Sequence, residues 1–135
     1  MNRQYAMAWS AWLRDPSNKQ TMGCLRDPSG FCCLGGLCEV WNSQESVITP
    51  LQWVPDSRTD GGKLKDLFSF FNAKSVLPME VMHEVGMHSV SGEFKFPGHL
   101  HPRKNQTISL TGCNDSGEFT FPMIADIVDY FWKEL

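Results

Sequence analysis

Lys19, Gln20 and Arg26 lie on a polar segment, residues 17–26, that follows Trp9 and Trp12. Arg or Lys on a phosphate, combined with a base stacked on an aromatic ring, is the usual means of holding a nucleotide. We therefore predict that Lys19, Gln20, Arg26 and Trp9 bind a phosphate-bearing ligand. The alternative is that the tryptophans belong to the core and the polar side chains cap the ends of elements.

A second cationic segment lies between residues 95 and 104 of a chain that is otherwise acidic. Its cationic and histidine side chains could form a local site for an anion or phosphate. We predict His99, His101, Arg103 and Lys104 as ligand-binding residues, with a solvated loop as the alternative. An H-x-H pair on a strand would point both rings to one side and could hold a transition metal, but exposed loop histidines are the favoured interpretation.

Cys24, Cys32, Cys33 and Cys38 are close in sequence but lack the paired spacings of a structural zinc site. A catalytic cysteine needs a thiolate stabilised by a nearby base or a helix N-terminus. Cys32 and Cys33 lie near such a terminus, but no histidine is close to them in sequence. Buried structural thiols are therefore the favoured interpretation.

The common catalytic motifs are absent: the chain has no G-x-S-x-G, no P-loop, no H-E-x-x-H and no G-x-G-x-x-G. Asp126 and Asp129, three residues apart, suit a solvated helix face better than a catalytic dyad. We predict no catalytic residue, no metal ligand and no cofactor. A binding protein is favoured over an enzyme.

The element that must position these side chains is the apolar stretch 31–41, FCCLGGLCEVW, which we predict to be a central buried helix capped by Ser29 or Gly30. We expect α+β architecture in a single domain, 1–135, with four to five helices packed around this Cys-rich helix and a small antiparallel sheet. The expected segments are helices over 2–14, 63–73 and 78–85, a last helix capped by Thr120, an extended arm over 17–26, an edge hairpin or irregular excursion over 42–59, and strands in the 90s and over 107–111.

Net charge and hydropathy argue against two classes of partner, nucleic-acid polymers and membranes. The 135 residues carry a net charge of −3, which argues against a nucleic-acid polymer, because such binding depends on Lys and Arg. No stretch reaches the roughly 18 apolar residues of a membrane span, and the N-terminus lacks the pattern of a signal peptide, so we expect a cytosolic protein with reduced thiols. The many aromatic residues suggest a homo-oligomer.

The chain resembles a family of small uncharacterised proteins of tailed bacteriophages and prophages. The resemblance lies in a W-x-x-x-L helix, a K-Q-x-x-G-x-L-R arm, an F-C-C-L-G-x-L-C-E block and a closing L-x-x-x-N-D-x-G-x-F-x-F-x-x-I-A-D segment. These motifs correspond here to residues 9–13, 19–26, 31–39 and 110–126. The sequence departs from the pattern at Gly36, where valine is expected, and at Cys113, where leucine is expected.

The resemblance implies a phage protein that works in the host cytoplasm, without an activity that can be assigned residue by residue. Small phage accessory proteins without enzymatic motifs often act against host defence. We expect a counter-defence protein that sequesters a nucleotide-type immune signal. One alternative is an inhibitor that binds a host defence protein through exposed aromatics such as Trp53; another is an unrecognised nucleotide hydrolase.

Overall fold

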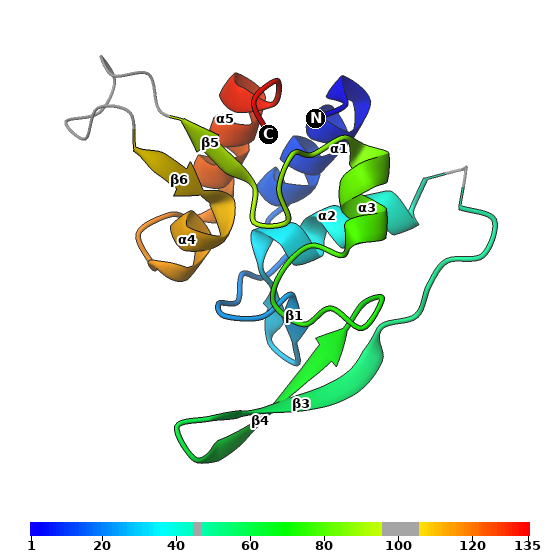
Figure 1. The fold of residues 1–135 in the computed structure, drawn as a ribbon, viewed down its shortest axis with the longest axis vertical. Helices are drawn as coiled ribbons and strands as arrows, with labels where there is room; N and C mark the ends of the chain where they lie inside the picture. The colour runs from blue at the N-terminus through cyan, green and yellow to red at the C-terminus, as the bar shows by residue number, and fades with distance from the viewer. Residues whose placement is uncertain (45–46, 96–105) are drawn as a thin grey trace.

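The computed structural model describes residues 1–44, 47–95 and 106–135. Within these ranges the chain forms five helices and six strands (Figure 1). In chain order they are α1 Arg3–Arg14, β1 Arg26–Asp27, β2 Gly30–Phe31, α2 Cys33–Asn42, β3 Val54–Asp60, β4 Lys63–Ser69, α3 Met79–Val85, β5 Glu93–Lys95, β6 Thr107–Ser109, α4 Leu110–Asp115 and α5 Phe121–Phe131. The predicted α+β fold with a small antiparallel sheet is confirmed.

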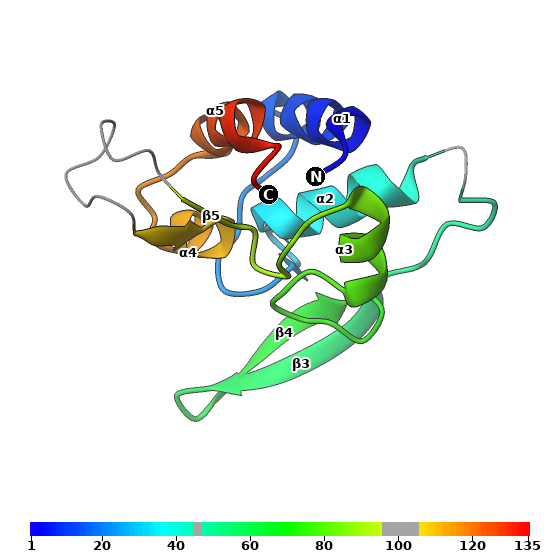
Figure 2. The same cartoon turned by 45° about the horizontal axis from the view of Figure 1, so that its top comes forward.

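Helix α2 lies at the centre of the fold, as the sequence predicts. Helices α1 and α5 lie side by side over one side of it, and α3 flanks it (Figure 2). Eight of its residues are buried, and two of them are cysteines: Cys33, Leu34, Gly35, Gly36, Leu37, Cys38, Val40 and Trp41. The helix has no polar face of any length because it is covered on several sides.

The start of α2 differs from the prediction. Its N-cap is Cys32, whose sulfur accepts a hydrogen bond from the Gly35 amide at 3.4 Å. Ser29 and Gly30 lie too far before the helix to cap it, because Gly30 belongs to β2 and the amides of both residues donate to Asp27 in the turn between β1 and β2. The Asp27-Pro28-Ser29-Gly30 stretch is thus a turn, as expected, but it joins two strands.

The two glycines of α2 allow close packing. A Cβ at Gly35 would collide with the carbonyl oxygen of Leu25, and one at Gly36 would collide with the ring of Trp12. The departure from valine at Gly36 therefore makes room for a tryptophan of α1. Glycine costs helix propensity of roughly 1 kcal/mol relative to alanine, but here it brings two neighbouring elements against the helix.

The prediction of a helix over 63–73 is wrong, because residues 63–69 form strand β4. Gly61 and Gly62, both at positive φ, make a two-residue turn that pairs β4 with β3 in register from Asp60↔Lys63 to Val54↔Ser69. Leucines and phenylalanines at helical spacing also fit a strand in which Leu67 and Ser69 point inward. The four-stranded antiparallel sheet has the order β2-β1-β4-β3, and its β3–β4 hairpin projects from the body (Figure 1).

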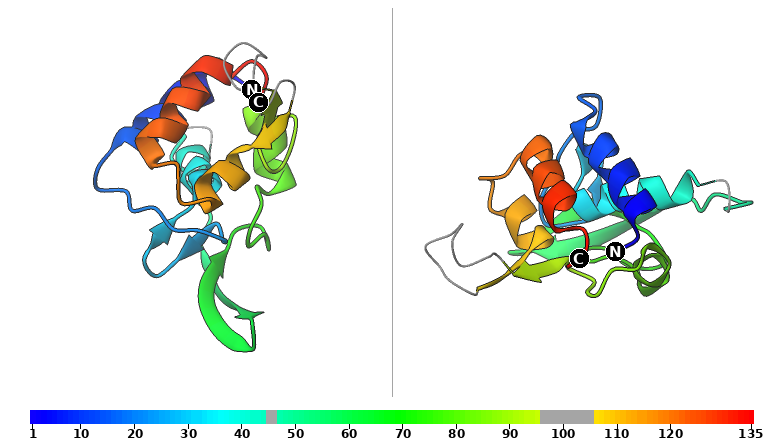
Figure 3. Two further views of the ribbon diagram at one scale, coloured as in Figure 1. Left: turned by 90° about the vertical axis from the view of Figure 1, so that its left-hand side faces the viewer. Right: turned by 90° about the horizontal axis from the view of Figure 1, so that it is seen from above.

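The remaining elements largely match expectation. Helix α3 ends at Gly86 in the left-handed conformation, and β5 pairs with β6 in antiparallel register. The predicted strand 107–111 is shorter, since α4 begins at Leu110, and Thr120 precedes α5 without a side-chain capping bond. The two termini lie close together (Figure 3). No helix in the described ranges combines the length and the apolar character that membrane crossing requires.

Candidate anion-binding site

Strand pairing sets Arg26 between two aromatic rings. Arg26 of β1 pairs with Phe31 of β2 on one side and with Phe68 of β4 on the other, so the three side chains form a row on one face of the sheet. The guanidinium carbon lies 4.9 Å from the centroid of the Phe31 ring and 4.8 Å from that of Phe68. Both distances are within the range of a cation–π interaction.

The ring of Trp53 is the third that lies near the guanidinium, and we call the rings of Phe31, Phe68 and Trp53 the aromatic surround. The Arg26 guanidinium carbon lies 5.5 Å from the centroid of Trp53, whose indole N–H donates to Glu39 Oε1 at 2.5 Å. The rings themselves are in contact, with centroids of Phe31 and Trp53 5.9 Å apart. Within the described part of the chain, the guanidinium has no hydrogen-bond acceptor and no carboxylate partner. Its N–H groups are held in place by stacking and remain available to a ligand.

The extended arm brings Lys19 to the same place. The Phe31 amide donates to the Lys19 carbonyl at 2.9 Å, and the Thr21 amide donates to the Phe31 carbonyl at 2.7 Å. This approach depends on Gly30, because a Cβ there would collide with the Lys19 carbonyl oxygen. The result is an open hollow of about 200 Å³. It is lined by Ser17, Asn18, Lys19, Arg26, Asp27, Pro28, Ser29, Gly30 and Phe31.

Asp27 contributes a carboxylate to this hollow, but its oxygens are already engaged. One oxygen accepts from Ser29 and Gly30, and the other accepts from the Thr21 hydroxyl at 2.7 Å and lies 3.6 Å from the Lys65 ammonium. Burial opposes ionisation of this carboxyl, yet the hydrogen bonds from Ser29 and Thr21 outweigh it and lower its pKa. With Lys65 beside Asp27, neither Lys19 nor Arg26 forms an ion pair with a carboxylate of the described residues.

Two of the predicted ligand-binding residues instead hold the fold together. Trp9 is fully buried, and its indole N–H donates to the Cys33 carbonyl at 2.9 Å. Gln20 donates its amide to Asn114 Oδ1 at 3.2 Å and to the Phe119 carbonyl at 2.9 Å. Trp9 has no exposed surface with which to contact a ligand, so its assignment is wrong, whereas Gln20 is partly exposed and its assignment stays a prediction. For Trp9, the alternative interpretation as a core residue is correct.

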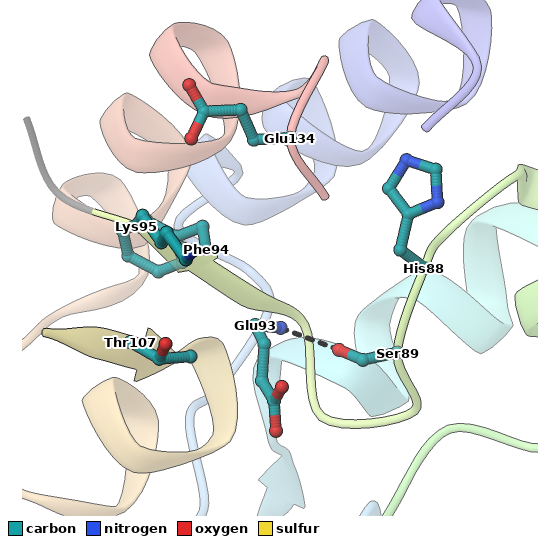
Figure 4. Close-up of a pocket in the computed structure, with 7 residues that line it drawn as sticks. All are labelled: His88, Ser89, Glu93, Phe94, Lys95, Thr107 and Glu134. Atoms are coloured by element: carbon teal, nitrogen blue, oxygen red, sulfur yellow. Dashed lines mark hydrogen bonds between the residues drawn. The ribbon is translucent and has the colours of Figure 1, made fainter. Parts of the chain in front are cut away.

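The second predicted set, His99, His101, Arg103 and Lys104, lies outside the described residues. Near its boundary, a hollow of about 430 Å³ is lined by His88, Ser89, Glu93, Phe94, Lys95, Thr107 and Glu134 (Figure 4). Two carboxylates and one lysine contribute to it, and the Glu93 amide donates to Ser89 Oγ at 2.7 Å. Among the described residues that line this hollow, one lysine thus faces two carboxylates, whereas two cations without an ion pair lie beside the arm.

The thiols are buried and protonated. All five cysteines are free and buried, and desolvation raises the pKa of Cys32 to about 12, while that of Cys33 is also well above its ordinary value. A thiol in that state is a poor nucleophile at neutral pH. Within the described ranges, no three His, Cys, Asp or Glu side chains are grouped so that they could hold a metal ion.

The sequence identified the two cations but missed the aromatic residues that surround one of them. Phe31 was assigned to the central helix and Phe68 to another helix, whereas both belong to strands adjacent to β1. The glycine pair at 61–62, followed by alternating residues, was the signal for a hairpin and hence for the position of Phe68.

Comparison with curated proteins and with solved structures finds no match. A family model described as a domain of unknown function (DUF8296) matches residues 1–131. Because the match spans nearly the whole chain, including the arm and the central helix, the protein belongs to this family.

Proposed function

We propose that the protein is a binding protein that holds the phosphate group of a small ligand between Lys19 and Arg26. One observation carries the proposal: a guanidinium stacked among three aromatic rings, without an acceptor in the described structure, shares an open hollow with the ammonium of Lys19, which forms no ion pair there. Charge-assisted bonds from Arg to phosphate are among the strongest polar contacts that proteins make.

The aromatic surround makes Arg26 a better anion receptor than a solvent-exposed arginine would be. A free arginine loses side-chain entropy of up to roughly 2 kcal/mol when a ligand fixes it. Here the rings of Phe31, Phe68 and Trp53 already restrict the guanidinium. Less entropy is therefore lost on binding, which raises affinity without additional contacts.

The resemblance to phage proteins supports a biological setting for this binding. We propose that the ligand is a nucleotide-type signal of host immunity, sequestered in the host cytoplasm. The hollow of about 200 Å³ is smaller than the roughly 300–1,000 Å³ of typical small-molecule pockets, so it accommodates the phosphate group and leaves the rest of such a ligand on the surface. The half-buried rings of Trp12 and Phe31 lie nearby, in edge contact at 5.6 Å.

Direct inhibition of a host defence protein is the second candidate. The observation in its favour is that Ile48 and Leu64, before and on the β3–β4 hairpin, are 95% and 72% exposed. The anchor expected from the sequence, Trp53, is half-buried and its indole N–H donates to Glu39, so only part of its ring is left for a partner. Phosphate binding is therefore the function that the geometry favours.

The test is calorimetric titration of the full chain with pyrophosphate, ADP-ribose and a panel of linear and cyclic nucleotides. We expect heat with at least one of them, and loss of about tenfold or more in affinity for Arg26→Gln, since a charged hydrogen bond contributes about 1.5–3 kcal/mol. Arg3→Gln, on the exposed start of α1, is the matched control and should bind like the wild type. Phosphorus NMR of the bound ligand separates binding from hydrolysis.

Folding of each variant is checked by thermal unfolding, because Arg26 also packs against three rings. Lys19→Ala gives a second route to the same conclusion, since this exposed side chain has only a 3.4 Å contact to the Pro16 carbonyl. Absence of heat with every ligand in a folded wild-type protein would overturn the proposal. Equal affinity in wild type, Arg26→Gln and Lys19→Ala would place the binding elsewhere.

A further inference from the structure

We infer that the Lys19–Arg26 hollow selects a terminal phosphate, a monoester that carries two negative charges, over an internal phosphodiester that carries one. This inference rests on the proposed function and names the chemical class of ligand that the same site takes. The geometry points to it through the number of free donors, the number of unbalanced charges and the size of the hollow.

The donors available to a ligand come from two side chains. The hydroxyl of Ser17 donates to Asp15, that of Ser29 donates to Asp27, and the amide of Asn18 donates to the Trp12 carbonyl. Among the side chains that line the hollow, Arg26 and Lys19 thus hold the charged N–H groups, and these have no strong acceptor in the described residues.

Together, one arginine and one lysine can bind three phosphate oxygens. An arginine fork takes two oxygens side by side, and a lysine ammonium binds a further one as a point charge. A terminal phosphate presents three non-bridging oxygens, enough for both side chains. A phosphodiester presents two, so a fork on Arg26 leaves Lys19 without an oxygen of its own.

The charge balance leads to the same class of ligand. Lys65 lies 3.6 Å from the carboxylate of Asp27, and among the described residues neither Lys19 nor Arg26 forms an ion pair, so two cationic side chains are available to the oxygens of a ligand. A phosphomonoester has a charge of about −1.5 to −2 at neutral pH, because its second pKa is about 6. A phosphodiester, with one negative charge, would leave one of these two cations without an anionic partner.

The size of the hollow also favours a terminal phosphate over an internal one. About 200 Å³ holds one phosphate group and a few attached atoms. The arm, which is hydrogen-bonded to β2, lines one part of the hollow, and the turn over residues 27–30 lines another. A monoester needs a single exit for its one substituent, whereas a diester needs two.

The surroundings predict a pH dependence that comes from the ligand. The charged groups that line or adjoin the hollow are Asp15, Lys19, Arg26 and Asp27, with Lys65 and Asp66 on β4. Hydrogen bonds lower the pKa of Asp15 and of Asp27, so both stay ionised well below neutrality. The described residues place no histidine in this group. Between about pH 5 and about pH 7.5, the phosphomonoester is therefore the group whose charge changes.

The experiment is a two-dimensional amide and guanidinium NMR titration of the full chain with methyl phosphate, dimethyl phosphate and sulfate, in low salt. At about pH 7.5 we expect methyl phosphate to bind about fivefold more tightly than dimethyl phosphate. The difference comes from its additional charged oxygen, which can contact the exposed ammonium of Lys19. At about pH 5 the ratio should fall to about two, while sulfate, a dianion at both pH values, should bind equally well.

Lys19→Ala should remove the preference and leave dimethyl phosphate binding nearly unchanged, whereas the control Lys63→Ala, at the tip of the hairpin, should retain it. Equal affinity for the two phosphate esters in the wild type would overturn the selectivity and leave the proposed function intact. A parallel loss of sulfate binding at about pH 5 would mean that the protein titrates, which would also refute the argument. No shift of the Arg26 side-chain signal with any of the three anions would overturn the proposed function itself.

Discussion

Asn114 links the cationic arm to the core, and its removal should be among the most damaging single changes in the protein. The side chain is fully buried at the end of α4. Its oxygen accepts from the Cys33 amide at 3.0 Å and from Gln20, and its nitrogen donates to the Thr21 carbonyl at 2.8 Å and to Asp115. Four bonds thus join three separate parts of the chain.

The cost of Asn114→Ala can be worked from these partners. Gln20 keeps its bond to the Phe119 carbonyl, and Asp115 is exposed, so neither is left buried and unsatisfied. The Cys33 amide and the Thr21 carbonyl lose a partner in the interior. At about 1–3 kcal/mol for each orphaned group, we expect a loss of about 2–6 kcal/mol in the free energy of unfolding.

Chemical denaturation and thermal unfolding measure this loss directly. A change of about 3 kcal/mol corresponds to a fall of about 10 °C in Tm for a chain of this size. Asn42→Ala is the matched control, because Asn42 also makes two side-chain bonds to a backbone segment, at Leu51, but at the surface. It should cost under about 1 kcal/mol. A loss below that value for Asn114→Ala would refute the reasoning, since the arm would then be held by other contacts.

Three further predictions follow from burial and charge. Gly35→Ala should prevent correct packing of β1 and lower Tm sharply, because the added Cβ collides with the Leu25 carbonyl; unchanged unfolding would contradict the close approach. Cys32 should react with a soluble thiol reagent only in denaturant, because its pKa is about 12 and it is buried; rapid labelling of the folded protein would refute this. Asp27→Asn should cost about 1–3 kcal/mol at neutral pH. Since the folded pKa of Asp27 is lowered, its contribution is present above the unfolded pKa and lost as pH falls through the folded value, so denaturation curves of the two proteins should converge in acid.

An element of this chain could be predicted from sequence when the residues that determine it lie close together in the chain. The helical periodicity of residues 2–14 and the terminator Gly86 act within a few residues, and both elements were predicted correctly. The stretch 63–73 satisfied a helical spacing as well as a strand alternation, and pairing with β3 decided between them. Strand β4 pairs with β3 on one side and with β1 on the other, and β1 lies far away in the sequence, so a local pattern does not reveal this pairing.

In the candidate site, too, residue type predicted some of the assignments, and contacts with residues distant in sequence decided the others. Lys19 and Arg26 could be identified by residue type, and the structure brings them to one hollow. Trp9 and Gln20 had equally suitable chemistry, but their partners, Cys33 and Phe119, are distant in sequence. Whether a polar side chain is free or engaged depends on such long-range contacts, which residue type and spacing leave undetermined.

The buried cysteine helix and the cationic hollow are connected through the backbone of Leu25. The Cys32 amide donates to the Leu25 carbonyl at 3.0 Å, and Gly35 packs against the same carbonyl. The next residue in the chain is Arg26, so the start of α2 fixes the strand that carries the guanidinium. A ligand group bound by Arg26 is therefore held on a strand that the buried start of α2 positions, and little rearrangement is needed on binding. Substitutions in α2 should for this reason weaken anion binding even though no side chain of the helix lines the hollow.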